Sequence, residues 1–162
     1  MKTIMKKVIF LDIDGVLNSV IYDRIRSKDE GNIDVTRLCL IKKIICATGA
    51  QIVLSSSWRK HWEVEIDKCD TIGREINSVF GQAGIRIHDK TLILQNRAEE
   101  ITEWLASHPD VHSYVILDDT FGGWGVHESR LVKTNSRMGR GLEERHVDAA
   151  IKILNGGSVH EQ

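Results

Sequence analysis

The chain has 162 residues, a formal net charge of −1, 41% hydrophobic residues and 28% charged residues. A chain of this length favours one domain, which buries roughly 70% of its unfolded surface. The near-neutral charge excludes a general attraction to nucleic acid or membranes, so a polyanion contact has to come from a local basic patch. We expect no membrane partner, because no segment approaches the ~20 apolar residues of a membrane span.

The N-terminal part of the chain contains its most informative stretch. Residues 7–13 form an apolar run that is broken by Asp12 and followed by Asp14 and Gly15. Such a run predicts a strand buried in a parallel sheet. The next residues, 18–33, are polar and highly charged, and we expect a loop or small flap beside the strand end.

A helix is predicted next, with Asp34 or Thr36 as its N-cap and Gly49 at its end. Residues 51–54 are a short apolar run typical of a buried strand. A second helical region is predicted over roughly 61–80. These elements continue the alternation of strand and helix.

The remaining elements follow the same alternation. They are a short strand at 85–88, a helix at 96–107, strands at 114–117 and 130–134, and a helix at 142–154. Strands that alternate with helices predict an α/β fold with a doubly wound, mostly parallel sheet. We expect one domain over residues 1–162, with its core at about 7–154.

The three cysteines indicate the chemical setting of the chain. Cys39, Cys46 and Cys69 show no zinc-site spacing. Cys39 and Cys46 lie in an apolar helical stretch, where we expect small core residues. The N-terminal residues have no apolar stretch long enough for a secretion signal. An odd number of cysteines without such a signal predicts a reducing, cytoplasmic location.

Three predicted strands are followed by polar side chains. These are Asp12 and Asp14, Ser55 and Ser56, and Asp118 and Asp119. In a parallel sheet the carboxyl ends of the strands lie at one edge, where ligands bind. Side chains that are far apart in the sequence should therefore meet in one pocket.

The residue types in this pocket indicate phosphate chemistry. Several carboxylates in one crevice need a cation, and oxygen ligands without a His/Cys cluster favour Mg²⁺ over Zn²⁺. One carboxylate could attack phosphorus to form an aspartyl-phosphate, while a second moves the proton. Ser55 or Ser56 can donate to a phosphate oxygen. Lys90 or Arg97 can stabilise the transferring phosphoryl group.

These motifs resemble those of the haloacid dehalogenase (HAD) superfamily of phosphohydrolases. Residues 12–17 (Asp-Ile-Asp-Gly-Val-Leu) resemble motif I, Ser55 after Ile-Val-Leu resembles motif II, and residues 115–119 (Val-Ile-Leu-Asp-Asp) resemble motif IV. The resemblance covers nearly the whole chain. It implies a HAD-like Rossmannoid three-layer sandwich.

Further positions resemble a small branch of the superfamily, the HAD domains of nucleic-acid repair proteins and the phosphatase domain of polynucleotide kinase. They are residues 55–59, Arg97 with Glu100-Ile101 and Trp104-Leu105, and Gly141-Leu142. The flap at 18–33 and the segment at 58–90 leave no room for a full cap domain. A minimal or absent cap implies an open site that accepts a large substrate or is closed by a partner subunit.

The resemblance also implies a role for each motif residue. Asp12 would be the nucleophile, and Asp14 the general acid/base with its backbone carbonyl on the metal. Asp118 and Asp119 would complete Mg²⁺ binding, directly or through water. Ser55 would hold the phosphate.

Two assignments within these motifs stay open. The superfamily usually has a lysine in motif III, whereas here Arg97 falls at the position of the branch pattern and Lys90 lies a few residues earlier. We favour Arg97, because a guanidinium can hold phosphate in a bidentate manner. Ser56 could take the role given to Ser55.

The sequence thus predicts a Mg²⁺-dependent phosphohydrolase acting on a phosphorylated small molecule or a nucleic-acid end. A phosphate-binding, receiver-like module without turnover is one alternative, and a nucleotide-sugar transferase with an Asp-x-Asp metal site is another. Trp58 and Trp62 could stack on a nucleobase or pack in the core. Several basic residues could form a rim for a polyanion or a solvated surface. They are Arg24, Arg26, Lys28, Arg59, Lys60, Arg137 and Arg140.

Overall fold

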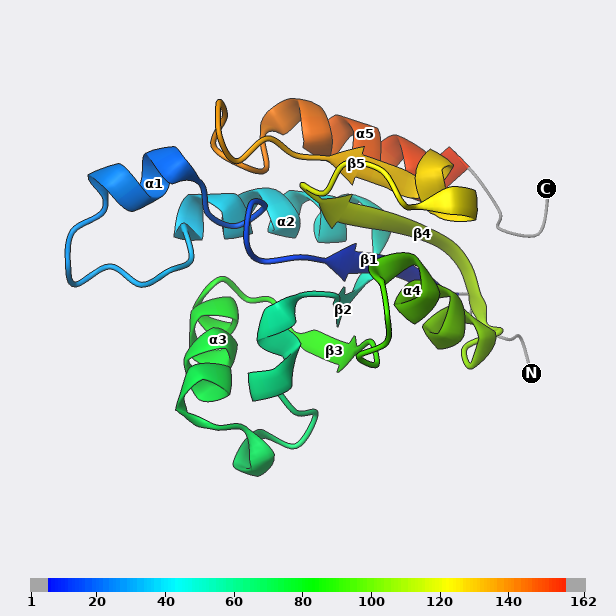
Figure 1. The fold of residues 1–162 in the computed structure, drawn as a ribbon, viewed down its shortest axis with the longest axis horizontal. Helices are drawn as coiled ribbons and strands as arrows, with labels where there is room; N and C mark the ends of the chain where they lie inside the picture. The colour runs from blue at the N-terminus through cyan, green and yellow to red at the C-terminus, as the bar shows by residue number, and fades with distance from the viewer. Residues whose placement is uncertain (1–5, 157–162) are drawn as a thin grey trace.

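The computed structural model, which describes residues 6–156, has a central sheet of five parallel strands with helices on both faces (Figure 1). The strand order is β3-β2-β1-β4-β5, and every neighbouring pair is parallel. The strands are β1 (Lys6–Leu11), β2 (Gln51–Leu54), β3 (Ile87–Lys90), β4 (Val111–Asp118) and β5 (Leu131–Lys133). The predicted three-layer α/β sandwich is therefore confirmed.

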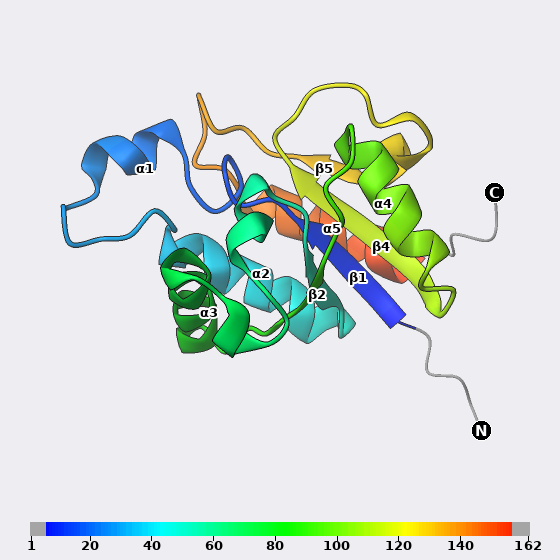
Figure 2. The same ribbon diagram turned by 60° about the horizontal axis from the view of Figure 1, so that its bottom comes forward.

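Helices cover the sheet because alternate strand residues point to opposite faces and both sets are apolar. The α-helices are α1 (Val20–Ile25), α2 (Val35–Thr48), α3 (Thr71–Gln82), α4 (Arg97–Ala106) and α5 (Glu144–Gly156). Ile9 and Leu11 of β1 face the core cluster formed with α2, α3 and α5. Val8 and Phe10 face the second cluster, which includes Ile101 of α4. Figure 2 shows α4 on one side of the sheet with α2 and α5 behind it.

The helix that follows the flap has the predicted ends. The side chain of Asp34 accepts a hydrogen bond from the Thr36 N–H as the N-cap of α2, and Gly49 ends the helix in the left-handed conformation. Cys39 and Cys46, however, are exposed, so the prediction that they belong to the core is wrong. They lie seven residues apart and so share one side of the helix, opposite the side that buries Leu38 and Ile41.

Two segments differ from the prediction in their secondary structure. The flap at 18–33 contains the short helix α1, which begins after an N-cap at Ser19 and buries none of its residues. The segment predicted as one helix over 61–80 instead has two 3-10 turns, η1 (Ser57–His61) and η2 (Ile66–Lys68), before α3. The flap is polar, so hydrophobic periodicity gives no signal there. Between residues 61 and 70, Val64 and Ile66 are apolar but exposed, so they mark no buried helix face.

The register of the strands places the predicted site residues next to one another at the carboxyl edge of the sheet. Leu11 of β1 pairs with Leu54 of β2 on one side and with Leu117 of β4 on the other. The next residues therefore lie side by side at its carboxyl edge: Asp12 and Ser55 directly after their strands, and Asp118 as the last residue of β4. The Asp12 N–H still donates to the Leu117 carbonyl at 3.0 Å, and the Ser55 N–H to the Leu11 carbonyl at 2.8 Å.

In residues 6–156, every helix is too short or too polar to cross a lipid bilayer.

Candidate active site

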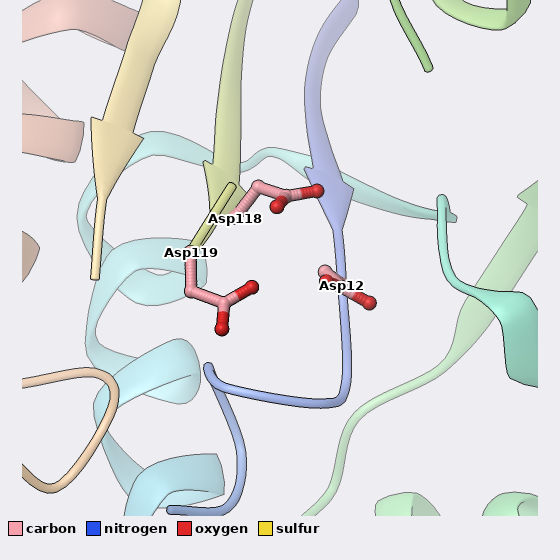
Figure 3. A group of neighbouring side chains, drawn as sticks. All are labelled: Asp12, Asp118 and Asp119. Carbon is pink, nitrogen blue, oxygen red and sulfur yellow. The ribbon is translucent and has the colours of Figure 1, made fainter. Parts of the chain in front are cut away.

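Three aspartates meet at the carboxyl edge of the sheet. Asp12, Asp118 and Asp119 each offer a carboxylate oxygen, and these oxygens lie within 4.8 Å of one another (Figure 3). Asp12 and Asp118 are buried, and Asp119 is partly buried. Figure 3 shows Asp12 after β1, Asp118 at the end of β4, and Asp119 directly after it. An oxygen-only donor set of this kind suits a hard divalent cation.

Electrostatics support the need for a cation here. The pKa of Asp12 is raised to about 7, first by burial and then by the charge of Asp118, while the charge of Arg97 opposes both. Burial is also the main cause that raises the pKa of Asp118. The protein alone thus disfavours ionisation of both carboxyls, and a divalent cation among their oxygens would favour it.

Arg97 supplies positive charge to the same cluster. It is the first residue of α4, whose N-cap is Asn96. Its Nη1 lies 3.3 Å from Asp118 Oδ2 and 3.6 Å from Asp12 Oδ1, and it also donates a hydrogen bond to the Ser55 carbonyl. The side chain is partly exposed. A guanidinium in this position can meet an anion that enters beside Asp12.

Lys90, the other predicted cation, has a different environment. Its Nζ donates to the Trp62 carbonyl at 2.7 Å, to Glu63 Oε1 at 2.9 Å and to the Arg59 carbonyl at 3.1 Å. These contacts attach the segment 59–63 to the end of β3. The structure thus places Arg97, and not Lys90, against the carboxylates.

The two serines after β2 differ in their hydrogen bonds. Ser56 Oγ accepts the Trp58 N–H at 3.2 Å as the N-cap of η1, and the Ser56 side chain also lowers the pKa of Asp12, against the larger effect of burial. Ser55 Oγ is buried and has no hydrogen-bond partner among the described residues. A buried hydroxyl without a partner is costly unless a ligand satisfies it. Ser55 is therefore the serine with a free donor.

Asp14 lies apart from the three clustered carboxylates and is exposed. Its Oδ2 accepts the indole N–H of Trp58 at 2.9 Å, and its Oδ1 accepts the Asn18 side-chain amide at 3.0 Å. The same Asn18 accepts the Gly15 N–H at 2.9 Å. The sequence pattern indicates neither of these supporting roles of Trp58 and Asn18, although Asn18 closes the turn that follows Asp14.

Gly15 is required where the first strand turns away from the sheet. Its φ is +82°, and a Cβ at this position would lie 2.1 Å from Asp119 Oδ2. The left-handed conformation and the close approach of the carboxylate both exclude a larger residue. The Gly15 carbonyl also accepts the Thr134 hydroxyl at 2.7 Å, and the Ser136 hydroxyl donates to Asp119 at 3.1 Å. The loop after β5 thus fixes the positions of Gly15 and Asp119 through these two hydrogen bonds.

A cleft of about 520 Å³ opens over these residues, and we call it the active cleft. Asp12, Asp14, Arg97 and Asp119 line it, together with Arg26 of the flap. Of the basic residues predicted as a rim, Arg59 is instead buried in an ion pair with Glu100, so that part of the prediction is wrong.

The parallel sheet, the carboxylates at its carboxyl edge and the small flap in place of a cap define a capless domain of the HAD superfamily, a superfamily of phosphoesterases. Within it, a family model described as the HAD domain in Swiss Army Knife RNA repair proteins matches residues 8–147. The chain belongs to this family. The resemblance inferred from the motifs is therefore confirmed. No curated protein matches the chain.

Proposed function

We propose that this protein is a Mg²⁺-dependent phosphatase that works through an aspartyl-phosphate on Asp12 and acts on the phosphate end of a nucleotide or nucleic acid. The observation that carries the proposal is the cluster of Asp12, Asp118 and Asp119 with the Arg97 guanidinium against two of its members. A buried carboxylate beside a cation site and an arginine is suited to attack an anionic phosphoryl group.

The first step is attack of an Asp12 carboxylate oxygen on phosphorus. The bond from phosphorus to the leaving oxygen breaks, and Asp14 donates a proton to that oxygen. In the second step Asp14 takes a proton from water, the water oxygen attacks phosphorus, and the bond to Asp12 breaks to release phosphate. Arg97 and the free Ser55 hydroxyl hold the phosphoryl oxygens.

Hydrogen bonds support the role of Asp14 in moving the proton. Trp58 and Asn18 each donate to a different oxygen of its carboxylate, so its orientation at the mouth of the cleft is defined. Asp14 lies outside the buried cluster, where solvent can exchange protons with it. Two carboxylates in such different environments are suited to separate tasks.

Asp12, Asp118 and Asp119 would hold the metal ion, with the Asp14 backbone carbonyl as a further oxygen ligand. When bound, Mg²⁺ would neutralise the carboxylates and the phosphoryl oxygens so that the two anions can approach. The family consists of HAD domains described in RNA repair proteins. This description supports a phosphorylated RNA end as the substrate. The open cleft beneath a small flap supports a substrate larger than a metabolite.

The purified protein is expected to release phosphate from p-nitrophenyl phosphate and from an oligoribonucleotide with a terminal phosphate. Activity should be lost when EDTA removes the metal and should return when Mg²⁺ is added. A stable phosphoprotein without turnover would contradict the proposal and favour a receiver-like module. Hydrolysis of a nucleotide sugar without phosphomonoesterase activity would favour a transferase.

The assignment of the phosphate-binding cation has its own test. Arg97→Ala is expected to lower kcat/KM by about 100-fold or more, since it removes the charge that faces the transferring group. Arg97→Lys should recover part of the loss. Lys90→Ala should keep most of the activity, because its amine binds residues 59–63. A larger loss from Lys90→Ala than from Arg97→Ala, in variants that are equally folded by circular dichroism, would reverse the assignment.

A further inference from the structure

A second cleft lies directly beside the active cleft. It has a volume of about 490 Å³. Residues of the flap, α2, α3 and η1 line it, among them Tyr22, Val35, Trp58, Glu75 and Val79. Trp58 and Asn32 line both clefts, so the two hollows meet at these residues. We call this second hollow the Trp58 cleft.

Trp58 is held in place at the boundary between the two clefts. Its backbone N–H donates to Ser56 Oγ at 3.2 Å, and its indole N–H donates to Asp14 Oδ2 at 2.9 Å. The ring is partly buried and packs against the core. A molecule that occupies both clefts therefore passes the Trp58 ring beside Asp14, the residue that we propose moves the proton.

The flap and α3 both line the Trp58 cleft. In both ribbon views the chain between α1 and α2 runs beside α3 (Figures 1 and 2), and a Cβ on Gly31 would lie 3.4 Å from Glu75 Oε1. Ile76 and Val79 give the α3 side an apolar wall. An apolar wall next to an indole ring suits a flat aromatic group.

The two clefts both have carboxylates but differ in their positive charge. Among the described residues, those that line the Trp58 cleft include four carboxylates (Asp29, Glu30, Asp34 and Glu75) and no lysine or arginine. The active cleft also has four carboxylates (Asp12, Asp14, Asp23 and Asp119), but Arg97 and Arg26 lie among them. A phosphate is thus repelled from the Trp58 cleft, whereas in the active cleft Arg97, Arg26 and the proposed metal ion would offset the carboxylates and bind it. Carboxylates at the rim accept hydrogen bonds, which suits an uncharged group with N–H donors at its edge.

We propose that the Trp58 cleft binds the nucleobase of the nucleotide whose phosphate is hydrolysed, against the Trp58 ring, with a preference for bases that have an exocyclic amino group. This inference rests on the proposed phosphatase function and names the part of the substrate that determines specificity. Cytosine and uracil differ at the C4 position, which has an amino donor in cytosine and a carbonyl in uracil, so an acceptor-rich rim should distinguish them.

The test fills the cleft and compares substrates with and without a base. Val79→Trp is expected to lower kcat/KM for cytidine monophosphate, tested as the 3′ and 5′ isomers, by about tenfold or more. The same variant should change kcat/KM for acetyl phosphate, which has no ring, by less than about twofold. Ser78→Trp, an exposed neighbour on α3 outside the cleft, is the matched control and should change neither value. Equal losses for both substrates in Val79→Trp, with an unchanged thermal unfolding temperature, would overturn the inference.

The base preference is measured on the same proteins. Wild-type protein should favour cytidine over uridine monophosphate by about threefold or more, and Glu75→Gln should reduce this ratio. A wild-type ratio of one would overturn the preference for amino groups.

Binding separates failure of this inference from failure of the proposed function. If no phosphate is released, calorimetric titration of the protein with cytidine monophosphate in the presence of Mg²⁺ still measures binding to the Trp58 cleft. If Val79→Trp weakens this binding, the inference is supported even without turnover. If Val79→Trp leaves the binding unchanged, or if ribose 5-phosphate binds as tightly as cytidine monophosphate, the inference is overturned.

Discussion

Asp12→Asn is expected to abolish turnover, with kcat at least about 10³-fold below that of the wild type. The amide has the same shape as the carboxyl but lacks the charge and the nucleophilic oxygen. The fold should persist, because the amide fills the same buried space as the carboxyl. The pKa of that carboxyl is already raised to about 7 in the metal-free protein, so the fold does not depend on its charge. Removal of this charge should raise the unfolding temperature of the metal-free protein near pH 8, since the cost of burying an ionised carboxylate disappears.

Phosphate release and trapping of the phosphoenzyme measure this prediction. Wild-type protein quenched in acid after brief exposure to a radioactive phosphate donor should contain label, and Asp12→Asn should contain none. Asp110→Asn is the control, because Asp110 lies at the opposite end of β4 and pairs with Lys6 at 3.0 Å. If Asp12→Asn retained a tenth of the wild-type rate, Asp12 could not be the nucleophile.

Glu100→Ala is expected to lower the free energy of unfolding by about 3–5 kcal/mol. Glu100 Oε1 lies 2.8 Å from Arg59 Nη2, and both side chains are 5% exposed. Glu100 Oε1 also accepts the Leu94 N–H at 3.1 Å, and Arg59 donates to the Ser56 carbonyl at 2.8 Å. Burial lowers the pKa of Arg59, and the charge of Glu100 opposes that shift. Removal of the Glu100 carboxylate therefore leaves the buried Arg59 guanidinium without its counter-charge.

Urea denaturation provides the measurement for the ion pair. The matched control is Glu65→Ala. It removes an ion pair in which Lys68 Nζ lies 3.1 Å from Glu65 Oε1 and both side chains are mostly exposed. Its loss should lower the free energy of unfolding by less than about 1 kcal/mol. The double variant Arg59→Met with Glu100→Leu should recover most of the loss, because no unpaired charge remains. Equal effects of Glu100→Ala and Glu65→Ala would show that the buried pair does not stabilise the fold. Activity should fall together with stability, since the pair joins the segment after Ser56 to the helix that begins at Arg97.

The elements that the sequence predicted best are those with strong local signals. The first strand is apolar on both faces, and α2 has a side-chain cap at Asp34 and a left-handed glycine at its end. The predicted helix over 61–80 is confirmed only from Thr71, where α3 buries Ile76 and Phe80 at helical spacing. The segments that the sequence predicted incorrectly are residues 18–33, which are polar, and residues 61–70, where Val64 and Ile66 are exposed and mark no buried face. The helix α1 buries no residue, so hydrophobic periodicity could not reveal it.

The cysteines show a second limit of local reasoning. An apolar helical stretch with residues such as Leu38 and Ile41 indicates that one side is buried, but cysteine is compatible with either side. Cys39 and Cys46 lie on the side that faces solvent, and only packing against the sheet decides which side that is.

By itself the sequence determined the fold class, the superfamily and the set of carboxylates, because each motif combines an apolar strand with polar residues directly after it. The convergence of Asp12, Ser55 and Asp118 required the strand register, in which Leu11 pairs with both neighbouring strands.

Only the tertiary structure shows which of Arg97 and Lys90 lies against the carboxylates, although the guanidinium chemistry already favoured Arg97. Both residues lie near the carboxyl edge of the sheet, and their chemistry suits either role. The Arg59 and Trp62 carbonyls and the Glu63 carboxylate bind the Lys90 amine, while the start of α4 directs Arg97 to Asp12 and Asp118. Which cation reaches the carboxylates depends on what surrounds each side chain, and spacing along the chain does not encode those surroundings.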